Sequence, residues 1–220
     1  MARKVEQRQP KKAIYVFWEG ESEEAYTKAL KRMFSAQAAI KPHREKGTFE
    51  TARTFYRGNK AFQNAIPEYD ELWFFFDTEL DKADQWERNM SCLKDIVAAR
   101  KRNPILIRLL MTTGCVEYWF QLHYERVRPA IATPADKVRV LNALQRHVPD
   151  YTKGDQAATD EIALGYKNAV ENGRWTLECL KRDGMPEEKT QRDQWLYQGR
   201  HTFTTVHEAV EMLMELVDKK

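Results

Sequence analysis

The sequence predicts an α/β protein with a central parallel sheet of about four strands, flanked by helices and followed by a helical C-terminal extension. Strand-like apolar runs at 13–18, 71–76 and 105–111, with a weaker candidate at 38–43, alternate with helical patterns. The run 71–76 is nearly all apolar, which is typical of a parallel strand buried on both faces. No strand-like run follows residue 115, so the second half should be helical.

The helical pattern between the strands is amphipathic. Ser22 is expected to cap the first helix, whose apolar stripe is Tyr26, Leu30, Met33 and Phe34, and whose acids Glu23 and Glu24 favour the helix dipole. The other expected helices cover 50–65, 81–101, 116–124, 134–147, 158–171 and 204–218, with loops at 149–157 and 183–203.

The chain of 220 residues suits one domain with an extension. We expect a flexible basic tail at 1–12, an α/β core at 13–125 and a helical extension at 126–220 packed on the core. The last helix carries a stripe that could dock to another protein or simply pack on the sheet. That stripe is Val206, Val210, Leu213, Met214 and Val217.

Composition excludes several classes of protein. The net charge is +3, from 36 basic and 33 acidic residues, which allows a nucleic-acid partner without requiring one. The cysteines Cys92, Cys115 and Cys179 are too few and too far apart for a disulfide framework or a cysteine metal site. No secretory signal and no membrane-length apolar run occur, so we expect a cytoplasmic protein. Phosphate-loop, dinucleotide-binding and serine-hydrolase motifs are absent from the sequence.

Acidic residues follow two of the predicted strands. Glu19 and Gly20 come directly after 13–18, and Asp77 and Glu79 come after 71–76. Carboxyl ends of parallel strands meet at one edge of a sheet, and Mg²⁺ prefers oxygen ligands. These acids therefore predict a magnesium or manganese site. The plainer alternatives are a solvated turn carboxylate for Glu19 and a helix cap for Asp77.

Three further residues are candidates for function. Glu117 lies in an apolar stretch, where a carboxylate needs a partner, a metal or a cleft. Lys153 could hold a phosphate, or be an ordinary surface lysine. His123 is not spaced for a zinc motif with Glu117 and is expected to be structural. A mixed basic and aromatic cluster could contact nucleic acid or be a solvated loop: Lys181, Arg182, Arg192, Trp195, Tyr197 and Arg200.

The segments 16–23, 75–79, 114–125 and 151–153 together resemble known proteins. A strand ending in Glu-Gly, followed by one ending in Asp-x-acid, is similar to the TOPRIM catalytic fold of topoisomerases, bacterial primases and OLD-type nucleases. Over roughly 11–217 the chain resembles the RloB-like family of bacterial defence proteins. The most specific match is the Glu-x-Trp-x-x-x-His-aromatic-Glu pattern that begins at Glu117.

The resemblance implies roles for individual residues. Glu19 matches the strand-one glutamate, Asp77 and Glu79 the two acids of the Asp-x-Asp motif, and Glu117 the later glutamate. Glu79 stands where Asp is more usual, and Thr113-Gly114 where Asn-Pro is usual. The region 13–125 would then be a TOPRIM-like core.

The expected function is phosphodiester cleavage by a Mg²⁺- or Mn²⁺-dependent nuclease. Its catalytic residues would be Glu19, Asp77, Glu79, Glu117 and Lys153, with metal on Glu19, Asp77 and Glu79. The resemblance implies work beside a separate ABC-type ATPase in anti-phage defence, including abortive infection, on DNA or RNA and without a membrane. The alternative is a non-catalytic nucleic-acid-binding or regulatory subunit of such a complex.

Overall fold

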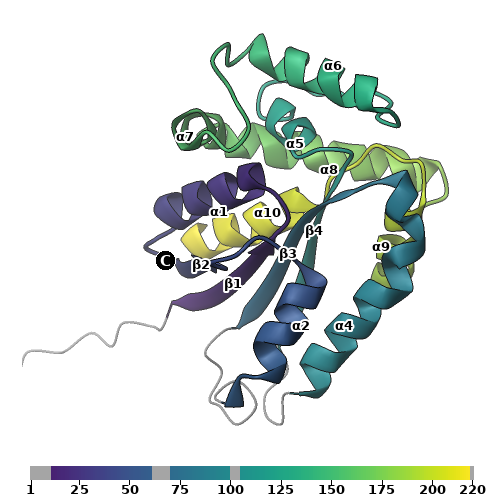
Figure 1. Cartoon of the computed structure of the whole chain (residues 1–220). Helices are drawn as coiled ribbons and strands as arrows, with labels where there is room; N and C mark the ends of the chain where they lie inside the picture. The colour runs from purple at the N-terminus through teal and green to yellow at the C-terminus, as the bar shows by residue number, and fades with distance from the viewer. Residues whose placement is uncertain (1–10, 61–69, 100–104, 219–220) are drawn as a thin grey trace, which may run out of the picture.

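The computed structural model describes residues 11–60, 70–99 and 105–218. In this part of the chain four parallel strands form one sheet in the order β2-β1-β3-β4 (Figure 1). The strands are β1 Lys12–Trp18, β2 Ala38–Pro42, β3 Glu71–Thr78 and β4 Leu106–Thr113. The predicted α/β class and parallel sheet are confirmed.

The strand order creates a switch point between β1 and β3. The chain leaves β1 toward β2 on one side and later returns to β3 on the other side. In open α/β sheets, ligands bind outside the carboxyl ends of the strands at such a point. Glu19 follows β1 directly, and Asp77 is the next-to-last residue of β3. The topology therefore places both acids where this kind of sheet binds ligands.

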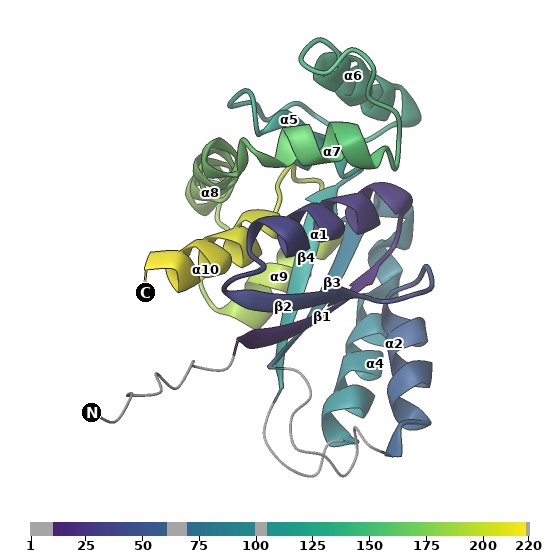
Figure 2. The same ribbon diagram turned by 90° about the vertical axis from the view of Figure 1, so that its left-hand side faces the viewer.

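One face of the sheet is covered by α1 Glu21–Met33 and α10 Val206–Asp218 (Figures 1 and 2). Phe75 of β3 lies in the apolar core on this side, together with Tyr26 of α1 and Val210 of α10. Val206, Val210 and Leu213 are fully buried, so this part of the stripe packs on the sheet, whereas Val217 at the end of the helix is 43% exposed.

The opposite face is covered by α2 Phe49–Arg57, α4 Trp86–Ala98 and α9 Lys189–Gln198. Phe74 and Phe76 of β3 lie in the core on this side, whereas Phe75 faces the other. Successive aromatic side chains of β3 thus pack alternately against the helices on the two faces of the sheet. This explains why the run 71–76 is nearly all apolar.

The remaining helices lie beyond the carboxyl ends of the strands. In Figure 1, α6 lies at the top, with α5, α7 and α8 between it and the sheet. They are α5 Glu117–Gln121, α6 Pro134–Gln145, α7 Gln156–Ala163 and α8 Tyr166–Arg182. In the described residues, no helix has both the length and the apolar character needed to span a membrane.

Several expected boundaries were wrong. Lys12 belongs to β1 and pairs with Glu71 at 2.5 Å, so the tail does not extend to residue 12. The helix expected at 81–101 begins as the 3₁₀ helix η1 Leu80–Gln85 before α4. The helix expected at 158–171 is divided between α7 and α8. Residues 61–65 of the helix expected at 50–65, and residues 100 and 101 of that at 81–101, lie outside the described residues.

The loop expected at 183–203 contains α9. The sequence of α9 is mostly polar, so it lacks the periodic apolar residues that indicate an amphipathic helix. The helix is stabilised instead by the Glu188 side chain, which accepts hydrogen bonds from the backbone N–H of Thr190 and Gln191, and by burial of Leu196.

His123 lies just after α5 and is structural, as expected. Its Nδ1 is 3.0 Å from the Trp119 carbonyl oxygen, its Nε2 is 3.1 Å from the Tyr26 hydroxyl, and only 2% of the residue is exposed. Burial lowers the pKa of His123 from 6.5 to about 4.

We therefore expect stability to fall in acid. The unfolded chain takes up a proton below pH 6.5, whereas folded His123 does so only near pH 4. The stabilisation that neutral, buried His123 gives the folded state is full above the unfolded pKa of 6.5. About 2 kcal/mol of it should be lost by pH 5. Urea unfolding of His123→Gln at pH 7 and pH 5 should show a smaller pH dependence than wild type. The exposed His147→Gln is the control, and an equal slope in both variants would contradict the assignment.

Candidate active site

Glu19 lies against the end of β3. Its backbone N–H donates to the Phe75 carbonyl at 3.0 Å, and its Oε2 accepts from the Asp77 N–H at 3.2 Å. Its Oε1 lies 3.0 Å from the Lys82 ammonium. The two strands therefore bring the two predicted acids together, and Glu19 is more than a solvated turn carboxylate.

Asp77 has an unsatisfied buried oxygen. Its Oδ1 is buried and has no hydrogen-bond partner among the described residues. The 3₁₀ helix that follows has Glu79 at its N-cap position, without a side-chain cap bond, so the structure does not show Asp77 as a cap. Burial raises the pKa of Asp77 well above its usual range, and Glu23 and Glu19 raise it further. A buried carboxylate oxygen of this kind needs a cation or a proton.

Glu23 is a site residue that the sequence analysis missed. It was assigned only to the helix dipole, yet it is 3% exposed and lines the same cleft as Asp77. Burial, followed by the charges of Glu117 and Glu19, raises the pKa of Glu23 from 4.5 to about 7. A Cβ at Gly20 would lie 2.6 Å from Glu23 Oε2, so the glycine leaves room for this carboxylate. The glutamate three residues after a strand-end Glu-Gly is the signal that could have revealed it.

Glu117 begins α5 and is 1% exposed. Its Oε1 accepts from the Tyr151 hydroxyl at 3.0 Å and from the Ser22 hydroxyl at 3.4 Å. Ser22 was expected to cap α1. The helix instead begins at Glu21 with Gly20 as N-cap, because the Ser22 hydroxyl is directed to Glu117 and Tyr151. These bonds fix the orientation of the Glu117 carboxylate.

Lys153 lies beside Glu117, with 3.5 Å between its Nζ and Glu117 Oε2. The next residue, Gly154, adopts φ +78° and donates its N–H to Ser22 Oγ at 3.1 Å. Burial would lower the pKa of Lys153, but Glu117 outweighs this and raises it. The side chain is still 62% exposed, so its ammonium is charged and accessible at the edge of the cleft.

Glu79 is engaged differently from Asp77. Its carboxylate pairs with Lys82 at 2.7 Å and with Lys137 of α6. Burial would raise its pKa, but the hydrogen bonds from Lys137 and Lys82 outweigh this and lower it. Asp77 and Glu79, which were expected to act as a pair, therefore have different surroundings. Asp77 has an oxygen without a partner among the described residues, whereas Glu79 pairs with the ammonium groups of Lys82 and Lys137.

These residues line a cleft of about 370 Å³ that we call the acidic cleft. Its carboxylates are Glu19, Glu21, Glu23, Asp77, Glu79 and Glu117, and its ammonium groups are Lys46, Lys82, Lys137 and Lys153. Within the described ranges, no group of three or more acidic, histidine or cysteine side chains is placed so that it could hold a metal ion as it stands. The donors are all carboxylate oxygens, and Asp77 Oδ1 lacks a partner, so the residues fit a hard divalent cation.

The other predicted basic and aromatic cluster does not form one accessible surface. Arg192 pairs with Asp193 at 2.8 Å and with Glu208 at 2.6 Å. Trp195 stacks on His201 with 3.6 Å between ring centroids, and Tyr197 is buried. The solvated-loop alternative was also incomplete, because part of the cluster belongs to α9.

The fold and the cleft define an α/β protein with a parallel sheet and a carboxylate cluster at its switch point. The family model of RloB-like protein matches residues 14–213, which include all of the acids above and Lys153. The chain belongs to the RloB-like family. Neither a curated protein nor a solved structure matches it significantly.

The buried Glu23 leads to a prediction. We expect Glu23→Gln to weaken Mn²⁺ binding about 10–100-fold, as loss of a supporting group in a metal site does. Its apo form should be more stable, because one charge leaves a repulsive cluster. Glu24→Gln is the matched control, since Glu24 lies in the same helical turn but pairs with Lys28 at 2.7 Å. Calorimetric Mn²⁺ titration of both variants checks this, and equal affinities would remove Glu23 from the site.

Proposed function

We propose that this protein is a Mg²⁺- or Mn²⁺-dependent nuclease that cleaves phosphodiester bonds. The observation that carries the proposal is the unpartnered oxygen of Asp77 at the switch point, beside the carboxylates of Glu19 and Glu23. Such a group is costly unless it serves a function, and perturbed carboxylates in a cleft are typical of functional sites.

Each residue has a role in this proposal. Asp77 and Glu19 would hold the metal, with Glu23 close by and Glu79 joining if Lys82 or Lys137 moves aside. Glu117, oriented by Tyr151, would complete the site, and Lys153 would place a positive charge on a substrate phosphate. A bound divalent ion would neutralise charge that develops on the phosphodiester and help to activate the attacking water.

The lysines of the acidic cleft support a phosphate-bearing substrate. Lys46, Lys82, Lys137 and Lys153 line the same cleft as the acids, although the whole chain carries only +3. Ammonium groups act as point charges toward phosphate. The balance suits a site that binds a metal and an anion together.

The proposed setting is phage defence in the cytoplasm beside a separate ABC-type ATPase. This follows from the resemblance to RloB-like defence proteins, and the sequence has no phosphate loop of its own. The modest charge gives little non-specific hold on nucleic acid, so a partner would raise activity.

A second candidate function is a non-catalytic nucleic-acid-binding or regulatory subunit. It is favoured by one observation, the Lys82 bridge between Glu19 and Glu79, which satisfies two of the acids without metal. In that case the carboxylates would be structural.

The test is a cleavage assay with labelled single-stranded and duplex DNA and RNA in Mg²⁺, Mn²⁺ or EDTA, with and without the co-purifying ATPase. We expect cleavage only with metal and stimulation by the ATPase. Glu117→Gln should lose activity, whereas the exposed Glu171→Gln should keep it. No metal-dependent cleavage under any of these conditions would favour the binding subunit. Full cleavage by the single chain, unchanged by the ATPase, would contradict the partner.

A further inference from the structure

A second charged cleft, of about 660 Å³, lies between α6, α8 and the segment 125–130. We call it the arginine cleft. Four arginines line it, together with one tryptophan of α8: Arg126, Arg128, Arg139, Arg146 and Trp175. Figure 1 shows α6 and α8 on the same side of the molecule, beyond the carboxyl ends of the strands. No local sequence pattern indicates this cleft, because its four arginines are dispersed over 21 positions and come together only after folding.

The arginines are only partly neutralised. Arg126 donates to the Asn172 side-chain oxygen at 3.0 Å, and its guanidinium lies 6.0 Å from the Trp175 ring centroid, so both partners are neutral. Among the described residues, the Arg146 side chain has no ion-pair partner, and it is exposed. The lining also holds two carboxylates, Glu125 and Asp136, against the four guanidinium groups.

The other two arginines make ion pairs but keep part of their side chains exposed, 30% for Arg128 and 70% for Arg139. Arg128 lies 3.4 Å from Asp183, whose side chain is 52% exposed. Arg139 pairs with Asp136, but that carboxylate also accepts hydrogen bonds from the backbone N–H of Ala132 and Thr133 at the start of α6. The exposed Arg128–Asp183 pair contributes little energy, and the Arg139 guanidinium is exposed although Asp136 is buried, so an added anion can reach both arginines.

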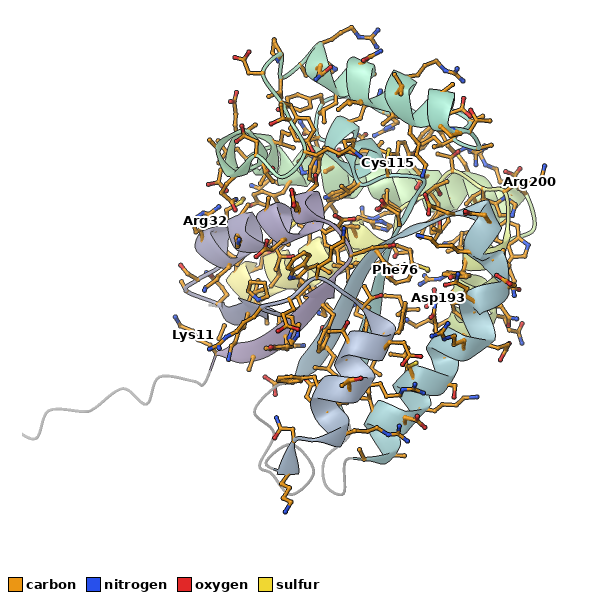
Figure 3. The ribbon with its side chains drawn as sticks, in the orientation of Figure 1. Lys11, Arg32, Phe76, Cys115, Asp193 and Arg200 are labelled. Carbon is orange, nitrogen blue, oxygen red and sulfur yellow. The ribbon has the colours of Figure 1, made fainter. Side chains whose placement is uncertain are left out.

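The arginine cleft adjoins the acidic cleft through an intermediate hollow. This hollow, of about 320 Å³, shares Ala130 with the arginine cleft and shares Glu79, Gly114 and Lys137 with the acidic cleft. Arg200 also lines it, and Figure 3 shows this residue at the right-hand edge of the molecule. The shared residues make the three hollows neighbours, and each of them is lined by at least one lysine or arginine.

We propose that the arginine cleft binds the phosphate backbone of a single-stranded nucleic acid whose scissile bond lies in the acidic cleft. Guanidinium groups bind phosphates with two parallel hydrogen bonds, which suits a chain of phosphates. A volume within the range of about 300–1,000 Å³ typical of small-ligand pockets takes a few nucleotides but cannot enclose a duplex. The inference extends the proposed nuclease function by naming the substrate class and the path that it takes.

The test is equilibrium binding of a fluorescently labelled 20-mer single strand, measured by anisotropy in EDTA so that nothing is cleaved. Arg126→Ala/Arg146→Ala should weaken binding at least 10-fold at low salt. It should also reduce the slope of log K against log salt by about 1.4, or about 0.7 for each lost phosphate contact. The matched control is Arg53→Ala/Arg88→Ala, which removes the same charge from α2 and α4. Arg146→Glu provides a single change at a side chain without an ion pair, should the double variant fold poorly.

The outcomes separate the two proposals. Loss of binding in the cleft variants but not in the control supports the path even if no cleavage is found. Equal affinity and equal salt slope in cleft and control variants would overturn it and leave the nuclease proposal untouched. Tighter binding of a duplex, or of polyglutamate, than of the single strand by the wild type would also overturn it.

Discussion

Asp77→Asn is expected to abolish metal-dependent cleavage while the protein stays folded. The change keeps the shape of the side chain and removes the charge that would hold the metal. Loss of one preorganised electrostatic group in an active site costs about 10²–10³-fold in rate, and a metal ligand should cost at least as much. Single-turnover cleavage at saturating Mn²⁺ measures the loss.

The same variant should be more stable than wild type without divalent metal. Asp77 Oδ1 is buried without a partner, and burial together with Glu23 and Glu19 disfavours its charged form. Removing the charge relieves this cost, and each 1 kcal/mol gained raises Tm by about 2–4 °C in a chain of this size. Asp84→Asn, an exposed change in the neighbouring 3₁₀ helix, is the control and should alter neither property. Wild-type cleavage by Asp77→Asn would exclude Asp77 as a ligand.

The second large effect is expected at the amino end of β3, where Arg108 of β4 pairs with Glu71. Arg108→Met should destabilise the protein by about 2–4 kcal/mol, because it leaves the buried Glu71 with less compensation. Glu71 is 1% exposed, and its Oε2 lies 3.1 Å from Arg108 Nε and 2.7 Å from Trp73 Nε1. Lys12 remains as a partner, which keeps the loss below that of a fully isolated charge.

Urea unfolding at pH 7 measures this loss. Arg88→Met is the control, because Arg88 pairs with Glu50 on the surface, where such pairs are worth about 0–1 kcal/mol. Burial would raise the pKa of Glu71, but the hydrogen bonds from Arg108 and Lys12 outweigh it and hold the pKa below 4.5. This stabilisation is full above pH 4.5 and is lost as the pH falls through the folded pKa. The difference between wild type and Arg108→Met should therefore shrink in acid, and a difference that grew would contradict the assignment.

Glu71 and Asp77 show how one strand can carry two kinds of carboxylate. At the amino end, Glu71 has four polar contacts from three residues, Trp73, Arg108 and Lys12, and a lowered pKa. At the carboxyl end, Asp77 has a buried oxygen without a partner and a raised pKa. The first arrangement is that of a structural ion pair, and the second has the perturbed pKa that is typical of functional sites.

The parts of the site that the sequence predicted depend on local pattern. The five apolar residues 72–76 form most of β3, so Asp77 lies at the end of this strand. Parallel pairing of β1 with β3 then brings Glu19 beside Asp77. Glu117 was found because a carboxylate in an apolar stretch needs a partner, and the structure supplies Tyr151 and Ser22.

The parts that the sequence did not predict depend on contacts between distant segments. Glu23 turns inward because Gly20 has no Cβ and because α1 packs against the sheet. Residues i and i+2 of a strand share a face, which suggested that Asp77 and Glu79 act together. In the structure, however, Glu79 pairs with Lys137, which lies 58 residues further along the chain in α6. No local sequence pattern indicates that contact.

The most direct test of the metal site is a crystal soaked in Mn²⁺, with anomalous data collected at the manganese absorption edge. We predict a peak within about 2–2.5 Å of Asp77 Oδ1, between Asp77 and Glu19, because this buried carboxylate oxygen has no hydrogen-bond partner among the described residues. The peak should be absent from Asp77→Asn crystals soaked in the same way. Ordered carboxylates at Glu19 and Asp77 with no anomalous density between them at saturating Mn²⁺ would contradict the metal site and the nuclease mechanism built on it.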